Sequence, residues 1–127
     1  ACVTAAGSRQ LAARLSNPLC DPAAIAARLD EVGHFVGEPA LKEDIRRALA
    51  TMPDLERALG RIVVGRGGPR DLACVRDALY AAERLSQRLR LSATIGGLPE
   101  GLARLEARLS EADLGLAGEL SRAIGSE

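Results

Sequence analysis

The chain has 127 residues, 17 basic and 17 acidic side chains and therefore a formal net charge of zero, and only 2% of its residues are aromatic. A net charge of zero argues against binding of nucleic acid or an anionic membrane through a positively charged overall surface. Phe35 and Tyr80 are too few rings for base stacking or an aromatic cage. The many alanines, leucines and arginines favour one helical domain, which would expose about 6,000–6,500 Å² if compact.

Several residues bear on disulfide formation, metal binding and the cellular compartment. Cys2, Cys20 and Cys74 are odd in number and none has CxxC spacing, so we expect reduced thiols. His34 with scattered cysteines cannot complete a four-ligand zinc site without carboxylates. No apolar run approaches the ~20 residues of a membrane span, and the start is not a signal peptide. We expect a cytoplasmic protein without a membrane partner. The chain begins at Ala1 without an initiator methionine, which indicates a piece of a longer polypeptide, although a processed terminus would look the same.

The first two predicted helices are bounded by prolines. Residues 4–17 predict a helix with Leu11 and Leu15 on one face, which Pro18 closes. An aspartate followed by a first-turn proline, at residues 21–22, predicts the start of the second helix. Its apolar positions are Ile25, Leu29, Val32 and Val36, spaced as on one face of an amphipathic helix.

Prolines also open the next helices. Residues 38–39 begin a third helix, Pro53 begins a fourth, and the glycine-rich residues 65–68 form the clearest break in the chain. Pro69 then starts the longest segment, which runs to about Leu91. Its apolar stripe comprises Leu72, Val75, Leu79, Ala82 and Leu89, close to a heptad seam.

The C-terminal part adds two shorter helices after a loop at residues 94–99. Apolar positions Leu98, Leu102, Leu105 and Leu109 belong to one helix, and Leu116, Leu120 and Ile124 belong to the last. We therefore predict an all-α fold in a single domain over residues 1–127. It is an array of about six to seven helices with one long helix near residues 69–91 and no convincing strand.

Charge is concentrated in the middle of the chain. Residues 57–90 carry eight arginines against three acidic residues, a net charge of +5, whereas residues 1–56 sum to −2 and residues 100–127 to −3. The middle could face a phosphate backbone. We favour the alternative of a solvated face whose charges partly pair, for example Asp77 with Arg76.

None of the reactive residues forms a convincing catalytic set. The glycine-rich loop at residues 65–70 lacks the Lys and Ser or Thr of a P-loop and reads as a turn between helices. His34 has no adjacent nucleophile and is expected to be partly packed, and the acidic pairs at residues 30–31 and 43–44 are expected to be solvated or capping. We assign no catalytic, cofactor-binding or metal residue and expect no enzymatic activity of this chain alone.

Four stretches of the chain follow the pattern of one family. Residues 4–9 resemble T-x-M-G-x-R, and a Pro-Leu pair follows at residues 18–19. Residues 54–62 resemble D-L-E-R-x-L-x-R-I/L, and residues 66–72 resemble R-x-x-P-R-D-L. In this order they resemble the helical core, or lever, of the bacterial DNA mismatch repair MutS family, orthodox or divergent. Ala6, Arg14 and Cys20 depart from the Met, Trp and Arg common in the family.

The resemblance implies that this chain is a segment of the core domain. The mismatch-binding and ATPase domains are absent from it, and so is the clamp, which would be inserted after about residue 125. The parent protein would recognise mispaired duplex DNA with a second MutS subunit, use ATP, ADP and Mg in its ATPase domain, recruit MutL and associate with the nucleoid. The segment itself would hold no cofactor, contact other domains of the same polypeptide and couple nucleotide state to DNA clamping.

Two other functions remain compatible with the residues. The first is a free-standing helical adaptor that binds a partner helix through an apolar seam. The second is a small helical DNA-binding domain that uses residues 57–90, whose affinity for duplexes would fall steeply with salt.

Overall fold

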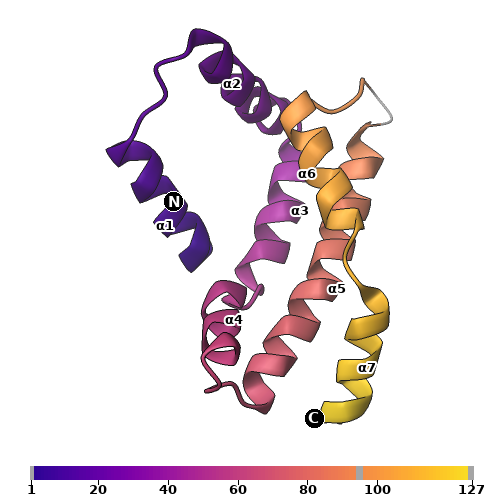
Figure 1. The fold of residues 1–127 in the computed structure, drawn as a ribbon. Helices are drawn as coiled ribbons and strands as arrows, with labels where there is room; N and C mark the ends of the chain where they lie inside the picture. Colours follow the sequence, from indigo (N-terminus) through magenta and orange to yellow (C-terminus); the bar gives the residue numbers. More distant parts are fainter. Residues whose placement is uncertain (1, 94–95, 126–127) are drawn as a thin grey trace.

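Seven α-helices form the part of the chain that the computed structural model describes, residues 2–93 and 96–125, and no strand occurs there. The predicted all-α array and its long helix are confirmed (Figure 1). Of the predicted loop at residues 94–99, the first two residues lie outside the described part. The helices are α1 (Ala5–Ser16), α2 (Pro22–Gly37), α3 (Pro39–Ala50), α4 (Leu55–Val63), α5 (Pro69–Ser92), α6 (Glu100–Ser110) and α7 (Leu114–Ile124).

Side-chain caps fix where several helices begin. The hydroxyl of Thr4 accepts a hydrogen bond from the Gly7 N–H at 2.9 Å, ahead of α1. The carboxylate of Asp21 accepts one from the Ala23 N–H at 3.3 Å, ahead of α2. Such caps satisfy N–H groups that have no partner within the helix. The predicted starts of these helices therefore follow from local chemistry alone.

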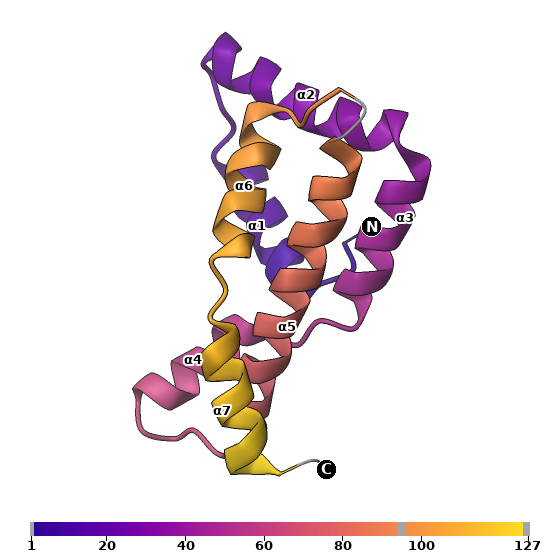
Figure 2. The same ribbon diagram turned by 90° about the vertical axis from the view of Figure 1, so that its right-hand side faces the viewer.

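The long helix α5 is the centre of the structure. It contacts α3, α4, α6 and α7, which surround it along its length (Figures 1 and 2). The side chains that form the buried apolar core all lie on these five helices, and half of them are alanines. They are Leu41, Ala58, Ala78, Ala81, Leu85, Leu89, Leu102 and Ala117.

The buried side of α5 differs from the predicted stripe. Of the stripe, Leu89 is buried, whereas Leu72 is 38% exposed and Val75, Leu79 and Ala82 are half-buried. The buried positions of α5 are Asp71, Ala78, Ala81, Leu85, Ser86 and Leu89. The predicted stripe contained mainly bulky apolar residues on one face of α5. Neighbouring helices instead contact α5 from several sides, and the residues buried at those contacts include small and hydrogen-bonded ones.

The chain exposes more surface than a compact protein of its mass. Its accessible surface is 8657 Å², about a third more than the ~6,450 Å² of a compact protein of this mass. No residue of α1 or α2 is buried. The apolar positions predicted for these helices are largely exposed, with Leu15 at 73%, Leu29 at 63% and Val36 at 71%. The area given for a compact chain therefore does not apply, because these amphipathic faces have no covering element among the described residues.

The helix α2 lies across the ends of α3 and α6, which it contacts (Figure 2). A Cβ atom on Gly101, in the first turn of α6, would collide with the carboxylate of Glu31 on α2. The Glu31 side chain thus lies directly against Gly101, where α2 and α6 meet. His34 of α2 is half-buried, with its Nε2 atom 3.4 Å from the Ser92 hydroxyl and its ring edge-on to Phe35. The prediction of a partly packed histidine is confirmed.

Candidate functional site

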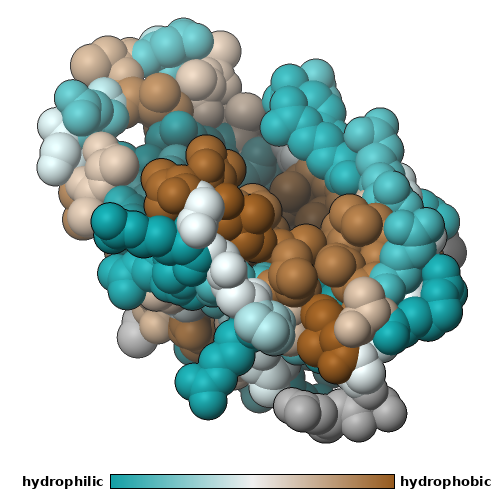
Figure 3. Space-filling view, turned by 60° about the horizontal axis from the view of Figure 1, so that its bottom comes forward, coloured by the Kyte–Doolittle hydropathy of each residue, from teal (hydrophilic) through white to brown (hydrophobic). Residues whose placement is uncertain are grey.

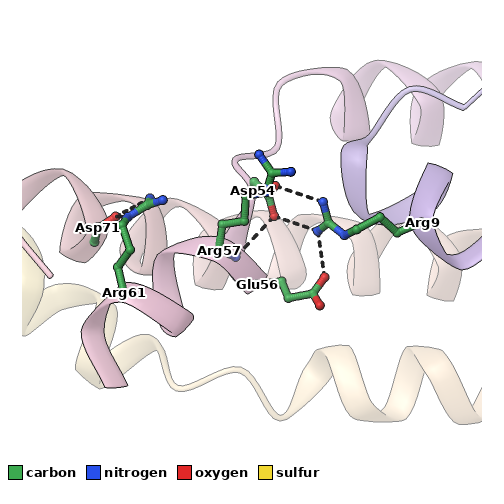
Figure 4. A network of polar contacts seen from close by, with 6 residues as sticks. All are labelled: Arg9, Asp54, Glu56, Arg57, Arg61 and Asp71. Carbon is green, nitrogen blue, oxygen red and sulfur yellow. Dashed lines mark hydrogen bonds and ion pairs between the residues drawn. The ribbon is translucent and has the colours of Figure 1, made fainter. Parts of the chain in front are cut away.

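A network of ion pairs joins α1, α4 and α5 (Figure 4). Its first part begins at Arg9 on α1. The guanidinium donates to Asp54 Oδ1 at 3.1 Å and to Glu56 Oε2 at 2.7 Å. These two acceptors lie at the N-cap and in the first turn of α4. One arginine therefore bridges two carboxylates at the beginning of another helix.

Asp54 has two roles at this junction. Its carboxylate accepts a hydrogen bond from the Arg57 N–H at 3.4 Å and so caps α4, while it also pairs with Arg9. The hydrogen bond from Arg9 is the main cause that lowers the pKa of Asp54, and the Arg57 N–H adds to it. Asp54 therefore remains ionised at a lower pH than a free aspartate does.

The second part of the network joins α4 to α5. Asp71, in the first turn of α5, is buried at 7% exposure. It accepts hydrogen bonds from Arg61 Nε at 2.8 Å and from the Gly68 N–H at 3.0 Å. The Arg61 guanidinium, and then this backbone donor, lower the pKa of Asp71. The negative charge is also favourable at the N-terminus of a helix.

The loop between α4 and α5 is a tight turn, as predicted. Gly65 has φ +74°, which is a left-handed conformation, and the Arg66 N–H donates to the Arg61 carbonyl at 2.8 Å. A Cβ atom on Gly67 would lie 2.7 Å from Ile62 Cγ1. Glycine is thus required at Gly65 for conformation and at Gly67 for space. The turn brings Arg61 within reach of Asp71.

Arginines of α5 form further links to its neighbours. Arg88 pairs with Asp44 of α3 at 2.8 Å, and Arg90 pairs with Glu106 of α6 at 2.7 Å. Glu106 also accepts a hydrogen bond from the buried Ser86 at 2.8 Å, and this bond and Arg90 lower its pKa. The acidic pair at residues 43–44 is therefore more than a solvated face.

Pairing accounts for most of the positive charge of residues 57–90. Five of the eight arginines there have ion pairs, including the expected pair of Arg76 with Asp77 at 2.8 Å. Within the described part, no ion pair involves Arg66, Arg70 or Arg84, and all three are exposed. This arrangement favours a largely neutralised face over a continuous phosphate-binding surface.

The remaining candidates stay apart from one another. The cysteines are free; Cys2 and Cys20 are exposed, and burial raises the pKa of the half-buried Cys74 thiol. Among the described residues, no group of three or more His, Cys, Asp or Glu side chains could hold a metal ion. None of the helices described is long and apolar enough to cross a membrane.

An apolar hollow lies beside the ion pairs of Arg9. It has a volume of about 640 Å³ and lies between the start of α1 and the turn from α3 to α4. Its apolar lining includes Val3, Ala6, Leu49, Met52 and Leu59. Figure 3, which brings the lower end of the molecule forward, also shows hydrophobic residues gathered across that face.

The network consists of ion pairs that connect helices. It contains carboxylates and guanidinium groups that neutralise one another, and it links three helices in series. Sequence reasoning did not pair Arg9 with Asp54, because 45 residues separate them. A signal was nevertheless present, since Thr4, Arg9, Asp54, Arg61 and Asp71 all belong to the motif stretches that carried the resemblance.

Comparison with known proteins gives one consistent family. The sequence profile described as MutS domain III matches residues 1–124. The chain is 51% identical over 98% of its length to the DNA mismatch repair protein MutS of Rhodopseudomonas palustris strain HaA2. It is 48% identical over 96% of its length to the protein of that name from Nitrobacter winogradskyi, and 44% identical over 84% to that of Caulobacter sp. strain K31.

The chain is short relative to these proteins. It spans only 13% of the Rhodopseudomonas and Nitrobacter proteins and 14% of the Caulobacter protein. No solved structure matches it.

Proposed function

This chain belongs to the MutS family of DNA mismatch repair proteins, within domain III, and we propose that it acts in the whole protein as a lever. The lever couples the nucleotide state of a distant ATPase domain to the clamping of DNA. The chain itself performs no catalysis. Mismatched duplex DNA, ATP or ADP with Mg, a second MutS subunit and MutL are engaged elsewhere in the full-length protein, which works at the nucleoid.

The observation that carries this proposal is the continuity of α5. It runs unbroken through 24 residues, which corresponds to roughly 36 Å of helix. Four other helices contact it, and ion pairs fasten it to α3, α4 and α6. Packed helices move as bodies between discrete arrangements, so a displacement at one end of α5 reaches the other.

The uncovered face of α2 fits a role inside a larger polypeptide. Leu29, Val32 and Val36 are each more than half exposed on one helix. An exposed apolar stripe of this kind marks an interaction surface. We expect other domains of the same polypeptide to cover it.

The test is to soften α5 without removing a buried side chain. Arg84 and Gln87 are exposed and lie inside α5. Glycine at both positions lowers helix stability by about 1 kcal/mol each relative to alanine. In the full-length protein, Arg84→Gly with Gln87→Gly should slow ATP-driven release from mismatched DNA at least about 5-fold, as expected for a coupling free energy of about 1 kcal/mol.

The double alanine variant of the same positions is the matched control. It removes the same side chains but keeps a stiff helix, so its release should match that of the unmodified protein. Mismatch affinity and nucleotide affinity should be unchanged in both variants. Equal release rates for the glycine and alanine pairs, in folded proteins, would refute the lever.

A further inference from the structure

The attachment of α1 to the rest of the chain is unusual for a helix of this length. The helix has 12 residues, none of which is buried. Its larger apolar side chains, Leu11 and Leu15, are 49% and 73% exposed. Figure 1 shows α1 to one side of the helices around α5. Burial of apolar surface, which holds most helices in place, therefore contributes little here.

Beneath the start of α1 there is space rather than packing. The hollow of about 640 Å³ has Val3, Ala5 and Ala6 on one side and Leu49, Leu55 and Leu59 on the other. A gap of this size deprives its lining of dispersion contacts. The two sides are therefore held at a distance by something other than direct contact.

Arg9 supplies the link that the structure describes. It reaches across to Asp54 at 3.1 Å and to Glu56 at 2.7 Å, and the Arg9 side chain is 37% exposed. The pair with Glu56 is exposed, whereas the pair with Asp54 is part-buried and includes a second bond, to Asp54 Oδ2 at 3.4 Å. Salt screens charges that reach solvent in this way. A helix held mainly in this way should detach at a small cost in free energy while the helices around α5 remain folded.

We propose that Arg9, Asp54 and Glu56 form an electrostatic clasp through which α1 docks on and detaches from α4 as a separate unit, in a salt-dependent equilibrium. The clasp opens by separation of charges, without any change in the helices that surround α5. The acceptors belong to α4, which Arg61 fastens to Asp71 of α5. The fixed side of the clasp is therefore the α4–α5 unit and the mobile side is α1. This inference does not depend on the lever.

Hydrogen exchange of the 127-residue chain itself, in which no neighbouring domain covers α1, tests the clasp by mass spectrometry. Amides of residues 5–16 should exchange at least about 3-fold faster when NaCl rises from about 0.05 M to about 0.5 M. Arg9→Gln should produce that acceleration already at low salt and should make exchange of α1 insensitive to salt. Exchange within residues 69–92 should stay constant throughout.

Arg14→Gln is the matched control, because Arg14 is an exposed arginine of the same helix. It should behave as the unmodified protein does. Glu56→Gln removes one negative charge of the clasp but leaves the Asp54 cap of α4 intact, so it should give a smaller acceleration. The clasp is wrong if Arg9→Gln and Arg14→Gln have the same effect on α1. It is equally wrong if Arg9→Gln accelerates exchange in α1 and α5 alike, because α1 would then belong to the same cooperative unit.

Discussion

The N-terminal arm, α1 and α2, and the bundle around α5 are both helical, yet different forces hold them. The arm contains no buried residue, whereas the bundle buries Leu41, Ala58 and Ala117 completely and α5 alone has six buried positions. Both regions carry amphipathic sequences. The difference teaches that amphipathicity specifies a helix and its apolar face, whereas stability depends on whether a partner covers that face.

Their connections differ in the same way. Within the bundle, ion pairs reinforce apolar contacts, as Arg61 and the buried Asp71 do between α4 and α5. Between α1 and the bundle, the Arg9 pairs lie beside a hollow. Ion pairs therefore supplement apolar packing within the bundle, whereas between α1 and the bundle they are the main attachment.

The largest expected effect comes from breaking one helix in each region. Leu79→Pro removes a hydrogen bond inside α5 and should lower the free energy of unfolding by at least about 3 kcal/mol. The melting midpoint, followed by circular dichroism, should fall by about 10 °C or more. Ala12→Pro inside α1 should abolish the helicity of α1 but shift the midpoint of the bundle by less than about 2 °C. Equal shifts would contradict the comparison.

Smaller changes in stability are expected when alanine replaces either of two glycines, and the two changes should have opposite signs. A Cβ atom at Gly67 would lie 2.7 Å from Ile62 Cγ1 and 3.0 Å from Ile62 Cα, so Gly67→Ala should destabilise the chain by about 1–2 kcal/mol. A Cβ atom at Gly33, inside α2, would enter open space, with no neighbouring atom within 4 Å. Gly33→Ala should therefore stabilise α2 by about 0.5–1 kcal/mol. Urea titrations of both variants would show whether the signs differ.

The smallest and most gradual effect is expected from acid. The pKa values of Asp54 and Asp71 are lowered by Arg9 and Arg61 respectively, so these carboxylates release protons more readily when folded. The stabilisation that these ionised carboxylates provide is complete above the ordinary aspartate pKa of about 4. It is lost as the pH falls through their lowered pKa values in the folded chain. The free energy of unfolding should therefore decline below about pH 4.

Asp71→Asn keeps the shape of the side chain and should reduce this decline. Glu111→Gln, at an exposed carboxylate with no ion pair among the described residues, should leave the decline unchanged. Urea titrations at pH 7, 4 and 3 would measure it. Identical pH profiles for both variants would show that the pair of Arg61 with Asp71 does not govern acid stability.

Much of the fold could be predicted because its signals are local. Caps and prolines at Asp21, Glu38 and Gly68 act within a few residues, and the structure begins α2, α3 and α5 there. The turn at Gly65 is equally local, since it depends on one backbone conformation. Such features need no knowledge of the rest of the chain.

The missed features all depend on distant parts of the chain. Periodicity marked Leu72 as a seam residue, yet it is exposed, whereas Ala78 is buried because neighbouring helices approach it. The pairs of Arg9 with Asp54 and of Arg88 with Asp44 join residues more than 40 positions apart. Charge type and helix period do not specify such partners, and the network emerged only from the packing of the helices.

The large exposed surface of the chain also affects its solubility. Its accessible surface exceeds that of a compact protein of equal mass by ~2,200 Å², an area near the lower end of what permanent protein–protein interfaces bury. The formal net charge is zero near neutral pH, so little long-range repulsion opposes contact between copies. In concentrated solution, the exposed leucines and valines of the arm should make separate copies adhere, and solubility should improve when a neighbouring domain shields them.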